Sequence, residues 1–103
     1  MFKNKSNRYV TRGVNAEVDI RLQLLMWSMI DNLKDKTNVE VDYLQVFKLR
    51  KEGNSIIIEH IQEEPEYKAG YSLELQDVEL ESKRKIYVID SGEYSTMLLP
   101  EEY

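Results

Sequence analysis

Past residue 40 the chain is a series of strand-like segments separated by turn signals, and this pattern restricts the fold more than any other feature of the sequence. The turn signals are Gly53-Asn54, Pro65 and Ser91-Gly92. Glycine and asparagine supply the positive φ of tight turns, and proline cannot donate to a strand ladder. Strands joined by tight turns pair in antiparallel fashion. The predicted strands are residues 43–50, 55–61, 71–75, 85–90 and 94–99.

The first predicted hairpin has a defined register. With the glycine–asparagine pair as its two-residue loop, Lys48 lies opposite Glu59. The same register places Phe47 opposite His60. Opposite charges that face each other across a ladder stabilise a sheet, so we expect an ion pair between Lys48 and Glu59.

An amphipathic helix is predicted before these strands, over residues 19–36. Either Asn15 or Asp19 could cap its N-terminus, since both side chains accept a hydrogen bond from a free backbone N–H. Lys34 and Lys36 suit the negative end of the helix dipole. The apolar side chains that share its core-facing arc are Leu22, Leu25, Met26, Met29, Ile30 and Leu33.

The segment before the helix is less regular. Residues 8–14 alternate as a short strand does, and residues 1–7 are expected to form a flexible N-terminus. With 103 residues the chain can build one hydrophobic core. We therefore predict a single α+β domain over residues 8–103, with a mostly antiparallel sheet of about five to six strands and one amphipathic helix packed on one face.

The chain contains no cysteine and one histidine, which removes most catalytic and metal chemistry. His60 could act with Glu59 or Glu63 in acid–base catalysis, but a metal site normally recruits several strong ligands. No glycine-rich phosphate loop, nucleophile elbow or calcium loop occurs. We therefore predict no catalytic residue, no cofactor and no metal site, and hence no enzyme. A small enzyme or ligand-binding protein around His60 is the second alternative.

Charge is distributed unevenly, although the formal net charge is only −5. Residues 1–16 hold four cations and no acid, whereas residues 59–81 hold eight acids against Lys68 alone. Two interpretations are open. Either the basic N-terminal arm packs near the acidic strands and neutralises them, or one of the two regions is a partner site.

A basic patch with an aromatic ring is predicted in the N-terminal arm, at Arg8, Tyr9 and Arg12. Cations beside an aromatic ring are typical of proteins that bind single-stranded nucleic acid. Lys48, Arg50, Lys51 and residues 83–85 would extend the patch only if the fold brings them together. The negative net charge argues against nucleic acid, because phosphate binding depends on cations, so this reading is the first alternative.

The predicted helix carries a second apolar stripe outside its core-facing arc. Its members are Ile20, Leu24 and Trp27. Either another part of the chain folds over this stripe and completes the core, or the stripe is an interface with a protein partner or a second copy of the chain. Tryptophan is enriched among the residues that dominate interface energies, which favours testing Trp27 as an anchor.

Several segments together resemble a family of small Firmicutes proteins, first catalogued from staphylococci as domain of unknown function 960. The resemblance rests on Arg-Tyr-Val-Thr-Arg-Gly at 8–13, Tyr-Leu-Gln-Val-Phe at 43–47, Pro-Glu-Tyr at 65–67, Ile-Tyr-Val-Ile-Asp at 86–90, Ser-Thr-Met-Leu-Leu at 95–99 and Glu-Glu-Tyr at 101–103. It implies a bacterial, cytosolic protein and supplies no activity.

The predicted function is that of a small binding or regulatory module that acts through protein–protein contact. The first ten residues lack a signal-peptide core, and no apolar run approaches the roughly 20 residues of a membrane helix. We therefore expect a cytoplasmic location and no membrane contact.

Overall fold

The computed structural model describes residues 1–80 and 83–103. Its elements are β1 (Arg8–Val10), α1 (Arg12–Glu17), α2 (Ile20–Lys36), β2 (Leu44–Glu52), β3 (Ser55–Gln62), β4 (Tyr67–Glu74), β5 (Lys83–Asp90), β6 (Ser95–Leu98) and the short 3-10 helix η1 (Pro100–Glu102). The strands form one six-stranded sheet in the order β1-β6-β5-β2-β3-β4. Neighbouring strands are antiparallel except β1 and β6, which are parallel.

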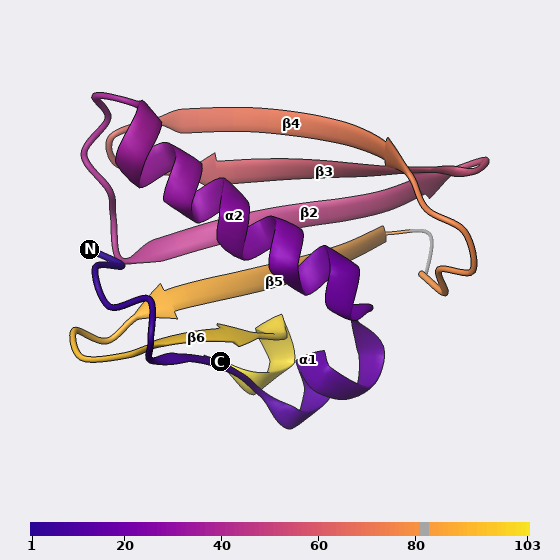
Figure 1. Cartoon of the computed structure of the whole chain (residues 1–103), viewed down its shortest axis with the longest axis horizontal. Coiled ribbons are helices and arrows are strands. Elements are labelled where there is room, and N and C mark those ends of the chain that lie inside the picture. Colours follow the sequence, from indigo (N-terminus) through magenta and orange to yellow (C-terminus); the bar gives the residue numbers. More distant parts are fainter. Residues whose placement is uncertain (81–82) are drawn as a thin grey trace.

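Helix α2 lies across one face of this sheet, and the core is packed between them (Figure 1). The predicted α+β class, with a mostly antiparallel sheet and one amphipathic helix on one face, is confirmed. Within the described ranges no helix is long and apolar enough to cross a membrane.

The first hairpin has the register expected from its turn. Phe47 pairs with His60 and Lys48 with Glu59, and Gly53 has a φ of 60°. The expected ion pair differs, because the Glu59 carboxylate contacts the Lys68 ammonium at 3.1 Å and the Arg50 guanidinium at 3.4 Å. Side chains from diagonal positions reach Glu59, so the register was right and the partner was wrong.

Helix α2 matches its predicted range. Asp19 is the N-cap and accepts a hydrogen bond from the backbone N–H of Arg21 at 2.8 Å. Asn15, the other candidate cap, lies inside α1. The side chains that α2 buries are Leu22, Gln23, Met26, Trp27, Met29, Ile30 and Leu33.

The strand predicted over residues 8–14 is wrong after Val10, because the chain turns into α1 there. Thr11 caps α1 by accepting a hydrogen bond from the Val14 N–H at 3.2 Å. The Glu102 carboxylate, from the far end of the chain, accepts hydrogen bonds from the Thr11 hydroxyl at 2.6 Å and the Gly13 N–H at 3.2 Å. A contact between residues about 90 positions apart stabilises this turn, and no local pattern reveals such a contact.

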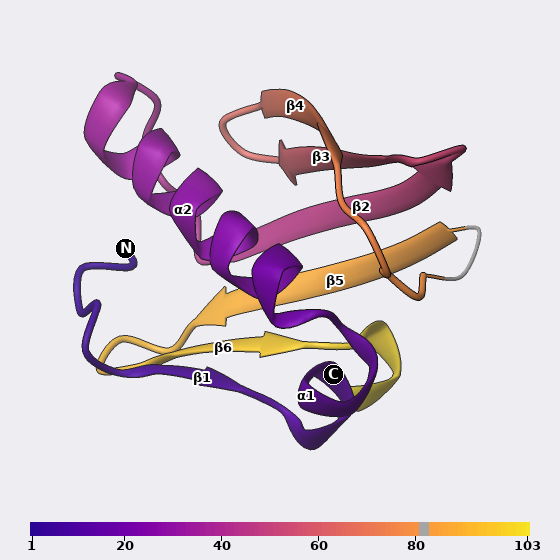
Figure 2. The same cartoon turned by 45° about the vertical axis from the view of Figure 1, so that its right-hand side comes forward.

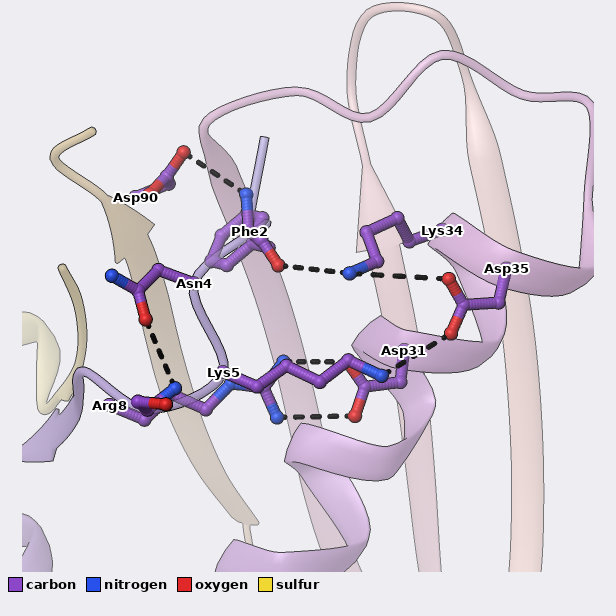
Figure 3. A network of polar contacts seen from close by, with 9 residues as sticks. Phe2, Asn4, Lys5, Arg8, Asp31, Lys34, Asp35 and Asp90 are labelled. Atoms are coloured by element: carbon purple, nitrogen blue, oxygen red, sulfur yellow. Dashed lines mark hydrogen bonds and ion pairs between the residues drawn. The ribbon is translucent and has the colours of Figure 1, made fainter. Parts of the chain in front are cut away.

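The N-terminal residues also differ from the flexible segment expected. The Phe2 side chain is only 2% exposed and belongs to the core. Its backbone N–H donates to Asp90 at 3.1 Å, and its carbonyl accepts from the Lys34 ammonium at 3.2 Å (Figure 3). Burial of this aromatic ring anchors the segment against the sheet and α2.

Candidate functional site

One face of the sheet is left uncovered. In Figures 1 and 2 helix α2 lies in front of the sheet, and among the described residues no α-helix lies on the opposite side, where Tyr103, just after η1, packs on Tyr87. Along the central strands, side chains that face α2 are buried, as Phe47 and Ile86 are, and those between them are half-buried or exposed, except Leu98 of β6, which is 7% exposed. We call this second surface the open face. Its central side chains are Leu44, Val46, Lys48 and Arg50 of β2, Ile57, Glu59 and Ile61 of β3, Lys83, Lys85, Tyr87 and Ile89 of β5, and Thr96 and Leu98 of β6.

Four cations gather on the open face. Strands β2 and β5 are neighbours, and their register places Lys48 directly opposite Lys85 and Arg50 directly opposite Lys83. We call these four residues the basic rows. Like charges directly opposite each other destabilise a sheet, so the arrangement costs folding energy. The basic rows line a shallow depression together with Glu52 and Glu59.

Carboxylates neutralise the basic rows only in part. Arg50 contacts Glu52 at 3.1 Å and Glu59 at 3.4 Å. Hydrogen bonding to Lys68, with the nearby cationic charge, lowers the pKa of Glu59, so this carboxylate stays ionised. Across residues 1–80 and 83–103, no ion pair is found for Lys48, Lys83 or Lys85. The surface therefore keeps a local positive charge.

Two tyrosine pairs lie on the same surface, one next to Lys85 and the other at the β1 edge, two strands from β5. The rings of Tyr87 and Tyr103 meet edge to face with centroids 5.8 Å apart, and those of Tyr9 and Tyr94 do so at 6.0 Å. Tyr9 is 54% exposed, Tyr94 47% and Tyr103 67%. The Lys85 ammonium lies 5.6 Å from the Tyr87 ring. The Tyr87–Tyr103 pair is thus next to the cations, and the Tyr9–Tyr94 pair is separated from them by Ile89 and Thr96.

The fold separates the three residues of the basic patch that was predicted in the N-terminal arm. The Arg8 guanidinium binds both carboxylate oxygens of Asp31, at 2.6 and 3.1 Å, and Lys5 lies 3.5 Å from Asp35 (Figure 3). Arg12 is an exposed residue of α1, so Tyr9 is the member of the patch that lies on the open face.

Within the described residues, Lys5 and Arg8 of the arm therefore pair with acids of α2 and not with the acidic residues of 59–80. The sheet order explains this outcome, because β1 and β4 are at opposite edges. Burial of Asp31 acts to raise its pKa, but the hydrogen bonds and charge of Arg8 outweigh this effect and lower the pKa overall.

His60 lies inside the core and away from the open face. Its side chain is fully buried, its ring stacks on Phe47 at 4.4 Å, and its Nε2 is 2.6 Å from the Gln45 side-chain oxygen. The Gln45 amide nitrogen donates to Asp42 and Gln62, so its oxygen is the acceptor and His60 Nε2 carries the proton. Protonating the ring would place a second donor at Nδ1, which has no hydrogen-bond partner in the described structure. This burial lowers the pKa of His60 to about 4.

The surroundings of His60 fit a structural residue. Within residues 1–80 and 83–103, no group of three or more His, Cys, Asp or Glu residues is placed to hold a metal ion.

Comparison with known families gives one match that spans nearly the whole chain. The family model described as staphylococcal protein of unknown function (DUF960) matches residues 7–102. The chain belongs to the DUF960 family. A crystal structure of a protein of unknown function from Enterococcus faecalis is similar to this DUF960 chain, with 25% identity, a TM-score of 0.77, and coverage of 100% of this chain and 98% of that one. No match is found among curated proteins. The resemblance noted in the sequence is thereby confirmed.

The second apolar stripe of the DUF960 helix is divided by the fold. Trp27 is only 8% exposed and belongs to the core, and the Arg8 guanidinium lies 4.9 Å above its ring. Ile20 and Leu24 are 59% and 62% exposed. The N-terminal strand therefore completes the core over Trp27, and the two aliphatic residues stay on the surface.

The open face of this DUF960 protein was not predicted as a site. The sequence did indicate it, because β2 and β3 carry apolar residues at both odd and even positions, as in the Ile56-Ile57-Ile58 run. Strict alternation is expected of a strand with one solvated face. The departure from alternation marked a sheet with apolar side chains on both faces, one of which α2 leaves uncovered.

Proposed function

We propose that this DUF960 protein is a binding protein without catalytic activity, and that its open face holds an extended anionic chain. The observation that carries the proposal is the direct opposition of Lys48 to Lys85 and of Arg50 to Lys83. Sheets gain stability from opposite charges at such positions, so two opposed cation pairs have a cost that an anionic ligand would offset.

The spacing of the basic rows suits a chain with repeated charges. Neighbouring strands lie about 4.8 Å apart, and alternate residues along one strand lie about 6.6–6.8 Å apart. Lys83 and Lys85 on β5, with Arg50 and Lys48 on β2, therefore form a regular grid of four cations. A linear polyanion can place successive charges on this grid, whereas a single small anion would use only part of it.

The acidic total charge does not oppose this proposal, because most acids lie away from the basic rows, where among the described residues only Glu52 and Glu59 line the same depression. Asp31 and Asp35 lie on α2, where Arg8 and Lys5 neutralise them. A further acidic group, Glu63, Glu64 and Glu66, follows the end of β3 that lies away from the basic rows. Local potential and not net charge governs the approach of a charged ligand to such a surface.

Inorganic polyphosphate is the probe that tests the charge requirement alone. We expect the wild-type protein to bind it at low ionic strength in isothermal titration calorimetry, and Lys85→Glu to weaken binding by about tenfold or more, since phosphate contacts are strongly charge-dependent. The matched control is Lys3→Glu, which makes the same charge change away from the open face.

The folded state of Lys85→Glu is not at risk, because an acid opposite Lys48 relieves like-charge repulsion and should leave stability equal or raised. Wild-type protein that fails to bind polyphosphate at millimolar concentration would contradict the proposal. Equal losses in Lys85→Glu and Lys3→Glu would contradict the assignment to the open face.

A contact with a second protein molecule is a separate candidate function, favoured by the exposure of Ile20 and Leu24 one turn apart on α2. Exposed aliphatic residues side by side on a helix are typical of a protein contact. If this pair supports self-association, wild-type protein should dimerise at high micromolar concentration in light scattering, and Leu24→Asp should stay monomeric. Monomers in both cases would rule out the self-association form of this candidate.

A further inference from the structure

We infer that the anionic chain is a single-stranded nucleic acid, with its phosphates on the basic rows and its bases against the tyrosines of the open face. This inference rests on the proposed function and adds the chemical class of the ligand. It comes from the placement of aromatic rings on the same strand as the cations. Strand β5 presents Lys83, Lys85, Tyr87 and Ile89 in succession on one surface.

The cations and rings lie along one track that follows β5 and then crosses β6 to β1. Tyr87 follows Lys85 by two residues on β5, and the rings of Tyr87 and Tyr103 meet edge to face. Beyond Tyr87, Ile89 pairs with Thr96, and Thr96 pairs with Tyr9, whose ring contacts Tyr94. The stretch from Lys83 to Ile89 is about 20 Å long at 3.3–3.4 Å per residue. A track of this length accommodates a few extended nucleotides.

Stacking separates nucleic acid from other linear polyanions. Every base has an aromatic face, so rings beside a basic groove bind single strands with little dependence on sequence. Polyphosphate and acidic peptides offer charges without flat rings and would leave Tyr9, Tyr94 and Tyr103 unused. The exposure of these three side chains, between 47% and 67%, leaves their rings accessible for such contacts.

The shape of the surface favours a single strand over a duplex. A duplex buries the faces of its bases and is read by an element that enters a groove, such as a helix. The long helix α2 lies on the opposite side of the sheet, so the open face presents no such element (Figure 2). A strand with unstacked bases can lie flat on a sheet, as bases do on other aromatic-bearing sheets.

The test compares three anionic probes with matched variants at low salt. Fluorescein-labelled oligothymidylate of 12 nucleotides is titrated with protein and followed by fluorescence anisotropy, with polyphosphate and poly-glutamate as competitors. We expect the oligonucleotide to bind more tightly than either competitor, and more tightly than a 12-base-pair duplex.

Substitutions of the tyrosines test the stacking directly. Tyr9→Leu and Tyr87→Leu keep an apolar side chain and remove the aromatic face, and each is expected to weaken oligothymidylate binding about fivefold or more. Polyphosphate binding should change less than about twofold in the same variants, because these substitutions leave every cation in place. Tyr9 is 54% exposed at a sheet edge, so Tyr9→Leu keeps the test valid if Tyr87→Leu does not fold.

The salt dependence of oligonucleotide binding reports how many phosphates the protein contacts. With up to four cations, the logarithm of the association constant should fall with the logarithm of salt concentration at a slope of roughly −2 to −3, and Lys85→Glu should reduce this slope by about 0.7 or more. Oligonucleotide and polyphosphate binding that respond alike to every variant would overturn the inference and leave the proposed function standing. Tighter binding of poly-glutamate than of the oligonucleotide would assign the surface to an acidic protein. Tighter binding of the duplex would also overturn the single-strand inference. No binding of any probe would overturn both proposals.

Discussion

Lowering the pH from 7 to 5 is expected to reduce the free energy of unfolding by about 2 kcal/mol through His60 alone. The folded protein holds the pKa of His60 at about 4, against 6.5 in an unfolded chain. Between these values the unfolded chain takes up a proton that the folded protein refuses, so folding becomes less favourable as the pH falls. Each pKa unit corresponds to about 1.4 kcal/mol, so the loss approaches about 3 kcal/mol near pH 4.

The measurement is urea unfolding of the wild type and of His60→Gln at pH 7 and pH 5. His60→Gln keeps a donor for Gln45 but has no group that titrates in this range. It should be less stable than the wild type at pH 7, since it loses the stacking on Phe47, yet its stability should differ little between the two pH values. A wild-type protein that is equally stable at pH 7 and pH 5 would show that the folded state accepts a proton on His60.

Trp27→Ala is expected to destabilise the folded monomer by about 3–5 kcal/mol, the usual range for removing a buried large aromatic side chain. Trp27 is 8% exposed, packs in the core and lies under the Arg8 guanidinium at 4.9 Å. The variant therefore loses apolar burial together with the ring that supports the Arg8–Asp31 pair. The sequence left open whether Trp27 belongs to the core or anchors an interface, and the structure places it in the core.

Leu24→Ala is the matched control for Trp27→Ala, because Leu24 lies on the same helix and is 62% exposed. Its stability should stay within about 0.5 kcal/mol of the wild type, as is usual for a surface position. Both variants are followed by far-UV circular dichroism during urea unfolding, since Trp27 is the sole tryptophan and its fluorescence is lost. A loss below about 1 kcal/mol in Trp27→Ala would contradict the placement of Trp27 in the core.

Features set by neighbouring residues were predictable from the sequence. The Gly53-Asn54 turn determined the pairing of Phe47 with His60, because a two-residue loop leaves one register. Asp19 and the apolar spacing after it determined where α2 begins and which side it buries. The Glu59 ion pair was assigned to the wrong cation, because register fixes which backbones are opposite and leaves long side chains free to reach diagonal neighbours.

Features set by contacts between distant residues were not predictable. The end of β1 depends on Glu102, and the cover over Trp27 depends on Arg8, which the sequence places in a basic patch. A cation that binds an anionic partner and a cation that pairs with a carboxylate of the same chain give the same sequence pattern. The position of β1 next to α2 decided in favour of Asp31.

The sequence by itself therefore determined the α+β class, the helix and the register of the first hairpin, since turn chemistry and hydrophobic periodicity act over a few residues. Only the tertiary structure placed β5 beside β2, which brings Lys85 opposite Lys48 across 37 positions of the chain. It also decided which face of the sheet α2 covers. The physical reason is that strand order and layer packing are settled by burial of the whole core, so a surface assembled from β2, β5 and β6 exists only once the sheet is complete.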